Sequence, residues 1–265
     1  GLGSSGSSGG GGALGGTGMG GSGEAGEAGG VGGAAAPAGK VLLSAEKGNG
    51  LVIEGALARG GGRLGYHLTF KNQGAAPLHQ FAVQFNKNGM GITNAAPLQL
   101  GSLPAGGALS TVLPLAHNSE KVNAGGPPLV LQVAVKSSGG IVYFQDAVPM
   151  HLALTEAGRI EGSEYPARWQ QIPATNQAVA PLPGCPTDAA AAEARLAAHN
   201  VHVLHRKPLA NGRGTALYCS CRTEDSVTLL AEVQVTAGGA RCAVRCDKAP
   251  YAQLLVTALQ TVLAE

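Results

Sequence analysis

The stretch Leu129-Val-Leu-Gln-Val-Ala-Val-Lys136, followed after Gly139-Gly140 by Ile141-Val-Tyr-Phe144, decides the fold of the first half of the chain. In the first run, leucine or valine recurs at every second position, which places these side chains on one face of a strand. The glycine pair supplies a turn, and a second apolar, β-like run begins directly after it. This is the pattern of short strands that are separated by turns.

The same pattern extends over residues 40–158. Tyr66, Leu68 and Phe70 alternate with polar residues in one earlier run, and a run from Phe81 to Phe85 does the same. Between the runs lie clusters of glycine, proline and asparagine, which are typical of turns. Alternation with a period of two and turns at this spacing predict an antiparallel β-sandwich over residues 40–158.

After Gly158 the pattern changes, and residues 159–265 form a second predicted subdomain. Pro186-Thr187-Asp188 begins one predicted helix, and a second begins near Pro250, a residue that the first turn of a helix tolerates. Strand-like runs lie between the helices, over 201–207, 215–222, 227–236 and 240–246. Helix, four antiparallel strands and helix make an α+β layer pair, distinct from the sandwich.

Residues 1–39 are about half glycine, with alanine, serine and little else. Such a segment buries too little apolar surface to offset its ordering entropy, so we expect a disordered linker. The first nine residues could be a tag, but the same composition continues well past them.

Charge is sparse and nearly balanced, with 13% charged residues and a formal net charge of +2. This balance argues against a nucleic-acid surface and against a basic membrane-binding patch. The sequence has no apolar run that approaches the roughly 20 residues of a spanning helix, and its beginning does not resemble a signal peptide. We therefore expect a soluble, cytosolic protein without direct membrane insertion.

Five cysteines bear on the question of a metal. Two pairs have the spacings Cys219-x-Cys221 and Cys242-x3-Cys246, and Cys185 stands apart. Zinc is one interpretation, but its ligands usually sit at loops with C-x2-4-C spacing. Even spacing inside strand-like runs favours the other interpretation, in which the cysteines are small buried apolar residues. We expect no metal and no cofactor.

The sequence gives no argument for an enzyme. It has no G-x-S-x-G, H-E-x-x-H or Walker motif. The seven histidines are scattered, and His202 and His205, three apart in one predicted strand, are expected to point to opposite faces. A shared metal at these two residues is therefore not expected.

The few large aromatic residues are the remaining guide to function. Trp169, the only tryptophan, lies in the proline-bounded segment Pro166-Ala-Arg-Trp-Gln-Gln-Ile-Pro173, which we interpret as irregular. It could seal a core, or it could be a binding hot spot, because tryptophan and tyrosine dominate such sites. Tyr218 and Tyr143 are open to the same two interpretations.

At several places, in order, the sequence resembles the appendage (ear) of the β-adaptins, large chains of clathrin adaptor complexes. In the predicted sandwich the resemblance rests on Phe81-Ala-Val-Gln-Phe-Asn-Lys-Asn88 with Gly91-Ile92, and on Leu131-Gln-Val-Ala-Val-Lys136 with Val142-Tyr-Phe144. In the second half it rests on Arg168-Trp-Gln-Gln-Ile-Pro173, Ala216-Leu-Tyr218 and Leu229-Leu-Ala-Glu232. The resemblance covers the chain from about residue 40 to its end.

The resemblance implies an immunoglobulin-like sandwich followed by a platform of antiparallel sheet flanked by helices, carried on a flexible hinge. It implies a platform groove for short peptides of endocytic accessory proteins, and clathrin as a further partner. By position, Trp169 and Tyr218 would be the aromatic groove residues and Glu232 a carboxylate for a basic ligand residue. Arg206 and Lys207 would meet acidic ligand residues, and Tyr143 would centre a second site on the sandwich.

One position departs from the family pattern. A second acidic groove position, a few residues after Trp169, is Gln177 here, which should weaken any preference for a ligand arginine. The resemblance further implies contact with other adaptor subunits through the rest of the chain, and a place at clathrin-coated membranes. Two alternatives stay open: the appendage of another large adaptin chain, and a structural β-sandwich domain without a peptide groove.

Overall fold

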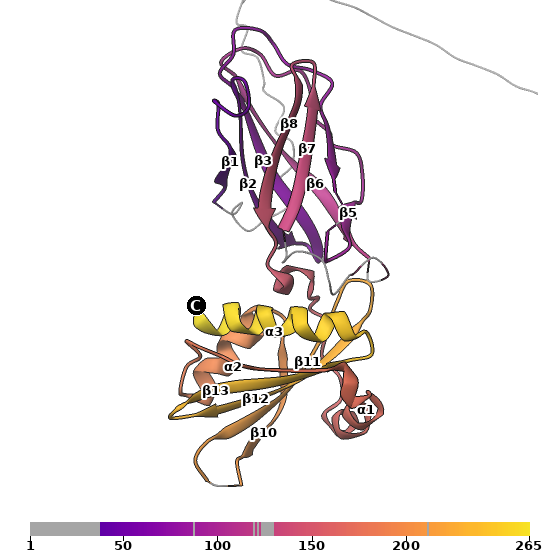
Figure 1. Cartoon of the computed structure of the whole chain (residues 1–265), viewed down its shortest axis with the longest axis vertical. Coiled ribbons are helices and arrows are strands. Elements are labelled where there is room, and N and C mark those ends of the chain that lie inside the picture. The colour runs from indigo at the N-terminus through magenta and orange to yellow at the C-terminus, as the bar shows by residue number, and fades with distance from the viewer. Residues whose placement is uncertain (1–37, 87, 119, 121, 123–129, 211) are drawn as a thin grey trace, which may run out of the picture. The chain divides into compact units, whose positions relative to one another are not determined.

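The computed structural model describes residues 38–265 except 87, 119, 121, 123–129 and 211 (Figure 1). The predicted linker, residues 1–39, therefore lies almost wholly outside the described residues. From Lys40 onward the chain forms antiparallel sheets, with helices in its second half, and this confirms the predicted fold class of sandwich and platform.

The sandwich consists of a five-stranded sheet in the order β1-β2-β3-β6-β5 and a three-stranded sheet in the order β4-β7-β8 (Figure 1). The two predicted strands on either side of Gly139-Gly140 form the hairpin β7-β8, with Val135 opposite Val142 and Ala134 opposite Tyr143. The strands are β1 (Lys40–Leu43), β2 (Leu51–Gly60), β3 (Arg63–Asn72), β4 (Ala82–Phe85), β5 (Ile92–Asn94), β6 (Ala108–His117), β7 (Val130–Ser137) and β8 (Gly140–Ala147).

Alternation along the strands builds the sandwich core. Leu131, Val133 and Val135 of β7 are almost fully buried, while Gln132 between them and Lys136 after them are exposed. One buried polar group inside this core is satisfied: the Tyr66 hydroxyl donates to Asp146 Oδ2 at 2.7 Å, and Lys40 Nζ lies 2.5 Å from Oδ1. Burial and the neighbouring carboxylate together raise the pKa of Tyr66 above its ordinary value.

The platform is a five-stranded sheet in the order β10-β11-β12-β13-β9. The sequence predicted four strands, and the structure adds β9 at an edge. The elements are α1 (Tyr165–Gln171), β9 (Gln177–Pro181), α2 (Ala189–Ala198), β10 (His202–Pro208), β11 (Thr215–Arg222), β12 (Thr228–Thr236), β13 (Gly239–Cys246) and α3 (Ala249–Ala264), with short 3-10 helices η2 (Met150–Ala153), η3 (Gly162–Glu164) and η4 (Ala174–Asn176).

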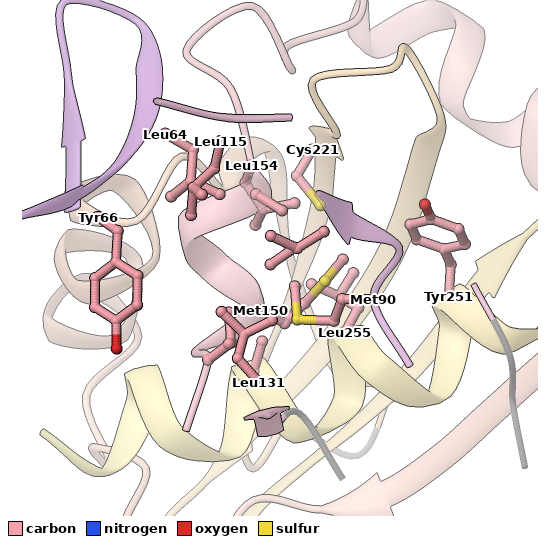
Figure 2. Packing of buried hydrophobic residues seen from close by; sticks show 14 of the residues in the cluster. Leu64, Tyr66, Met90, Leu115, Leu131, Met150, Leu154, Cys221, Tyr251 and Leu255 are labelled. Atoms are coloured by element: carbon pink, nitrogen blue, oxygen red, sulfur yellow. The ribbon is translucent and has the colours of Figure 1, made fainter. Parts of the chain in front are cut away.

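Helices α2 and α3 cover one face of the platform sheet (Figure 1). The Asp188 side chain caps α2 by accepting from the Ala191 backbone N–H at 2.9 Å, as the sequence predicts. Tyr251 and Leu255 of α3 are fully buried, and Figure 2 shows them among the buried side chains of the main core. Among the described residues, no helix is both long and apolar enough to cross a membrane.

The predicted boundary at Gly158 falls between η2 and η3. Thr155 donates its backbone N–H to the Arg222 carbonyl, and Leu154 makes an isolated β-bridge to Thr223, so the chain already contacts platform residues just before Gly158. We keep Gly158 as the proposed boundary between the subdomains.

Candidate functional site

The segment around Trp169 is a helix, α1, so the interpretation as irregular chain was wrong. Pro166 lies in the first turn, where a missing N–H costs nothing, and Glu164 pairs with Arg168 one turn later at 3.0 Å. Tyr165 and Ile172 at the two ends of the segment pack on Leu230 of β12. Helix α1 therefore docks on the face of the sheet opposite to α2 and α3.

Three aromatic rings meet where α1 touches the sheet. Trp169 stacks on Tyr165 with ring centroids 5.6 Å apart, and the Tyr218 ring meets Tyr165 edge-on at 5.3 Å. The Tyr165 hydroxyl donates to the Ala231 carbonyl at 3.0 Å. Sequence reasoning missed Tyr165, although its position four residues before Trp169 is the helical spacing of stacked side chains. Tyr165 is buried, whereas Trp169 and Tyr218 keep part of their surface in solvent.

A cation holds Trp169 in place. The Arg245 guanidinium lies 4.8 Å from the centre of the Trp169 ring and donates through Nη1 to the Trp169 carbonyl at 2.8 Å. Its Nε donates to Gln177 Oε1 at 2.8 Å. A stacked and hydrogen-bonded arginine of this kind fixes both the ring and the end of its helix. Sequence reasoning missed Arg245 because it follows Trp169 by 76 residues.

On the face of the platform sheet that carries α1, the strand register places side chains of neighbouring strands in rows across the sheet. The middle row contains Tyr218, Glu232, Ala243 and Val179, which lie opposite one another on β11, β12, β13 and β9. Directly opposite residues share a face of an antiparallel sheet. Burial raises the pKa of the Tyr218 hydroxyl, and the Glu232 carboxylate beside it adds to the rise.

Two hollows open along this row. One, of about 630 Å³, lies at the Tyr218 end and is bordered by Tyr165, Trp169 and Lys207. The other, of about 310 Å³, lies at the Val179 end and is bordered by Gln177 and Arg241. Trp169 and Glu232 border both hollows, so they are parts of one surface, which we call the platform groove.

The platform groove brings together four of the predicted site residues: Trp169, Tyr218, Glu232 and Gln177. Lys207 joins them, because it lies opposite Ala216 in register and so shares the face of Tyr218.

The neighbouring residue Arg206 lies opposite the buried Leu217 and pairs with Glu193 of α2 at 2.5 Å. Both cations, Arg206 and Lys207, border the larger hollow, and Arg206 is engaged by the Glu193 carboxylate.

Tyr143, the remaining predicted site residue, lies on a different surface. It stands on β8 of the three-stranded sandwich sheet, 68% exposed, opposite Ala134 of β7. Ile141, two residues earlier on the same face, is 55% exposed. We call this surface the sandwich face. It presents an aromatic and an aliphatic side chain to solvent at neighbouring positions.

The histidines of β10 do not lie as predicted. His202 pairs with Ser220 and His205 with Tyr218, so both share one face of the sheet. A register shift between Val203 and His205 inserts an extra residue, and such a bulge reverses the alternation. Within the described part of the chain, histidine, cysteine and acidic residues form no group of three or more that could hold a metal.

The four paired cysteines are buried, as their spacing predicted. Cys219, Cys221, Cys242 and Cys246 are at most 1% exposed and lie in the main hydrophobic core. Burial raises the pKa of the Cys242 and Cys246 thiols to about 11, so both are protonated at neutral pH. All four cysteines serve as small apolar residues of this core.

Comparison with known proteins points to one family. Residues 155–263 match the family model described as the beta2-adaptin appendage, C-terminal sub-domain. The chain is 30% identical over 230 residues to the human AP-1 complex subunit beta-1, a match that covers 84% of this chain and 24% of that protein. The AP-1 complex subunit beta of Dictyostelium discoideum is 29% identical over 215 residues, with 78% and 22% covered. The chain thus spans about a quarter of the length of these relatives.

Proposed function

The chain belongs to the β-adaptin appendage family, and on that premise we propose that it is a non-enzymatic protein-interaction module of a clathrin adaptor. Its platform groove binds short amphipathic peptides of trafficking accessory proteins. The single observation that carries this proposal is the pair of partly exposed aromatic rings, Trp169 and Tyr218, that border an open hollow of about 630 Å³.

The shape of the platform groove suits an amphipathic segment. Such ligands place a few apolar anchors into a hydrophobic groove and leave their polar face in water. The aromatic end accepts an anchor between Trp169 and Tyr218, and Ala243 and the exposed Val179 offer a second apolar position at the other end. Because Tyr165 and Arg245 already hold Trp169, binding requires little further ordering of the groove.

The sandwich face is the second proposed site. Tyr143 and Ile141 supply exposed apolar area on one strand, where a second peptide or a clathrin segment would dock. Single peptide contacts of this size are weak, but two sites on one tethered module raise overall affinity through effective concentration. In this proposal the rest of the chain contacts the other adaptor subunits, and the module works at the cytoplasmic surface of clathrin-coated membranes without inserting into them or binding nucleic acid.

One alternative from the sequence, a structural domain without a peptide groove, makes a different prediction. In such a domain the aromatic residues would be core residues, so replacing them would lower stability and nothing else. The partial exposure of Trp169 and Tyr218 supports the binding proposal instead. The other alternative, another large adaptin chain, is disfavoured because the relatives named above are β subunits.

Calorimetric titration with an amphipathic peptide from an accessory protein tests the proposal. Trp169→Ala removes a hot spot of about 2 kcal/mol, so affinity should fall roughly thirtyfold. Tyr143→Ala, which changes an aromatic residue outside the platform groove, is the matched control and should leave this affinity unchanged. Normal binding by Trp169→Ala, or complete unfolding of this variant in a thermal melt, would refute the assignment of the groove.

A further inference from the structure

Two arginines at the Val179 end of the platform groove are held by amide oxygens. Arg241 Nε donates to Gln234 Oε1 at 2.8 Å, and Arg245 Nε donates to Gln177 Oε1 at 2.8 Å. Among the ion pairs between described residues, none includes either arginine. Their charges are therefore oriented by neutral partners and are not neutralised by a carboxylate at contact distance.

Arg241 and Arg245 differ in how many of their guanidinium N–H donors are already engaged in hydrogen bonds. Arg245 uses Nε for Gln177 and Nη1 for the carbonyls of Trp169 and Ile172, so its main role is to position Trp169. Arg241 is exposed on β13, and only its Nε is engaged among the residues that the structure describes. A guanidinium carries five N–H donors in a planar fork. The two terminal nitrogens of Arg241 remain available to a ligand.

Among the residues that the structure describes, Glu232 is the one carboxylate that borders this hollow, and it is already engaged. Gln234 Nε2 donates to Glu232 Oε1 at 2.6 Å, while the same side chain accepts from Arg241 through its oxygen. The Gln234 amide thus forms hydrogen bonds to both Glu232 and Arg241, and the two charged groups do not pair directly. Arg241 and Glu232 border this hollow, and Arg245 contacts two of its lining residues, Trp169 and Gln177. When Arg245 is counted with them, the described residues at this end of the groove carry a net positive charge.

Resting on the proposed function, we propose that the Val179 end of the platform groove is a carboxylate-binding subsite. The peptide that the groove accepts carries an aspartate or glutamate beside its apolar anchor, and this side chain pairs with the free fork of Arg241. A carboxylate matches the fork with two parallel hydrogen bonds. A ligand arginine in the same place would meet Glu232 alone and would be repelled by Arg241 and Arg245.

Gln177 makes this preference possible. A glutamate at this position would pair with Arg245 and reduce the positive charge of the hollow. Glutamine keeps the hydrogen bond that orients Arg245 but leaves its charge in place. Gln177→Glu should therefore weaken the preference for an acidic ligand while leaving Trp169 in position.

Two synthetic peptides of about 15 residues, with apolar anchors at helical spacing, provide the test. They differ only in one residue beside the last anchor, glutamate in one and arginine in the other. A second pair carries the same difference beside the first anchor, because the orientation of the ligand is free. We expect the wild-type chain to bind the glutamate form of one pair about three- to tenfold more tightly at low salt, and high salt should reduce the ratio.

Charge-changing variants identify the residue responsible. Arg241→Glu should abolish or invert the preference, and Gln177→Glu should reduce it. Arg63→Glu, at an exposed position on β3 of the sandwich, makes the same change of net charge and should leave the preference intact.

Three outcomes separate this inference from the proposed function. Equal binding of all peptides, lost in Trp169→Ala, would overturn the carboxylate subsite and leave the proposed function standing. A preference that survives Arg241→Glu would overturn the subsite as well. Failure of every peptide to bind would overturn the proposed function, and the inference with it.

Discussion

The platform groove and the sandwich face are both open sides of antiparallel sheets, but they present their aromatic residues differently. Trp169 is stacked on Tyr165, held by Arg245 and partly buried, whereas Tyr143 is 68% exposed on a strand. Affinity depends on how much ordering a ligand must impose, so a ring that is already held contributes more than a free one. We therefore expect the platform groove to be the stronger site and the sandwich face the weaker one.

The largest expected effect comes from removing the support beneath the groove. Tyr165 is buried, stacks on Trp169 and donates to the Ala231 carbonyl. Tyr165→Ala should lower the free energy of unfolding by about 3 kcal/mol and abolish peptide binding. Tyr165→Phe keeps the ring and should lose only about 1 kcal/mol. Urea unfolding of both variants checks this, and equal losses would show that the stacked ring is not what supports the groove.

A smaller effect is expected from Arg245, which holds Trp169 without lying in the core. Arg245→Ala removes the contact with the ring and the bonds to the Trp169 carbonyl and Gln177. Peptide affinity should fall about tenfold and stability by about 1 kcal/mol. Arg245→Lys keeps the charge without the planar fork and should recover only part of the affinity. Full recovery with lysine, measured by calorimetry, would mean that charge alone matters.

Acid should weaken both surfaces together, because both depend on the same folded unit. Burial and the neighbouring His199 lower the pKa of His151 to about 4, and the pKa values of His117 and His202 are lowered as well, mainly by burial. In the unfolded chain these three imidazole rings become protonated near pH 6.5, whereas in the folded chain they become protonated only at lower pH. Stability is therefore full above about pH 6.5 and falls as the pH decreases toward about 4.

The His151 part of this loss is on the order of 1–2 kcal/mol, less than the full pKa difference implies, because the partly exposed ring is screened by water. Urea unfolding at several pH values should show the slope, and His151→Gln should make it shallower. A slope unchanged in that variant would place the effect elsewhere.

The smallest effect is expected on the sandwich face. Tyr143→Ala removes a side chain that supports little packing, so stability should change by no more than about 0.5 kcal/mol. Groove ligands should bind as before, while any ligand of the sandwich face should weaken. A thermal melt and parallel titrations check this, and a large loss of stability would show that Tyr143 supports the fold.

The two regions also differ in how far the sequence predicted them. The sandwich strands and four platform strands followed from alternating apolar residues such as Leu131, Val133 and Val135, because burial of one face is a local property of the pattern. Strand β9 was missed, because this edge strand contains Pro181, turns only alanines inward and exposes Val179, so its sequence lacks the alternation of large apolar and polar residues.

At the site, the resemblance to the family suggested Trp169, Tyr218, Glu232 and Gln177, and the structure brings these together. Their supports could not be predicted. Arg245 lies opposite Gln177 because β13 and β9 pair, and a bulge in β10 places His202 and His205 on one face against the simple alternation. Contacts that depend on the register between segments far apart in the sequence cannot be predicted from the sequence pattern and are seen only in the three-dimensional structure.

The central claim is that Trp169 is a wall of the ligand site, and its own fluorescence tests this most directly because it is the only tryptophan in the chain. Titration with the amphipathic peptide should shift the emission to shorter wavelength and protect it from a soluble quencher, with the midpoint that calorimetry gives. Tyr218→Ala should weaken this response. An unchanged emission spectrum and unchanged quenching at saturating peptide, with calorimetry still reporting binding, would contradict the account.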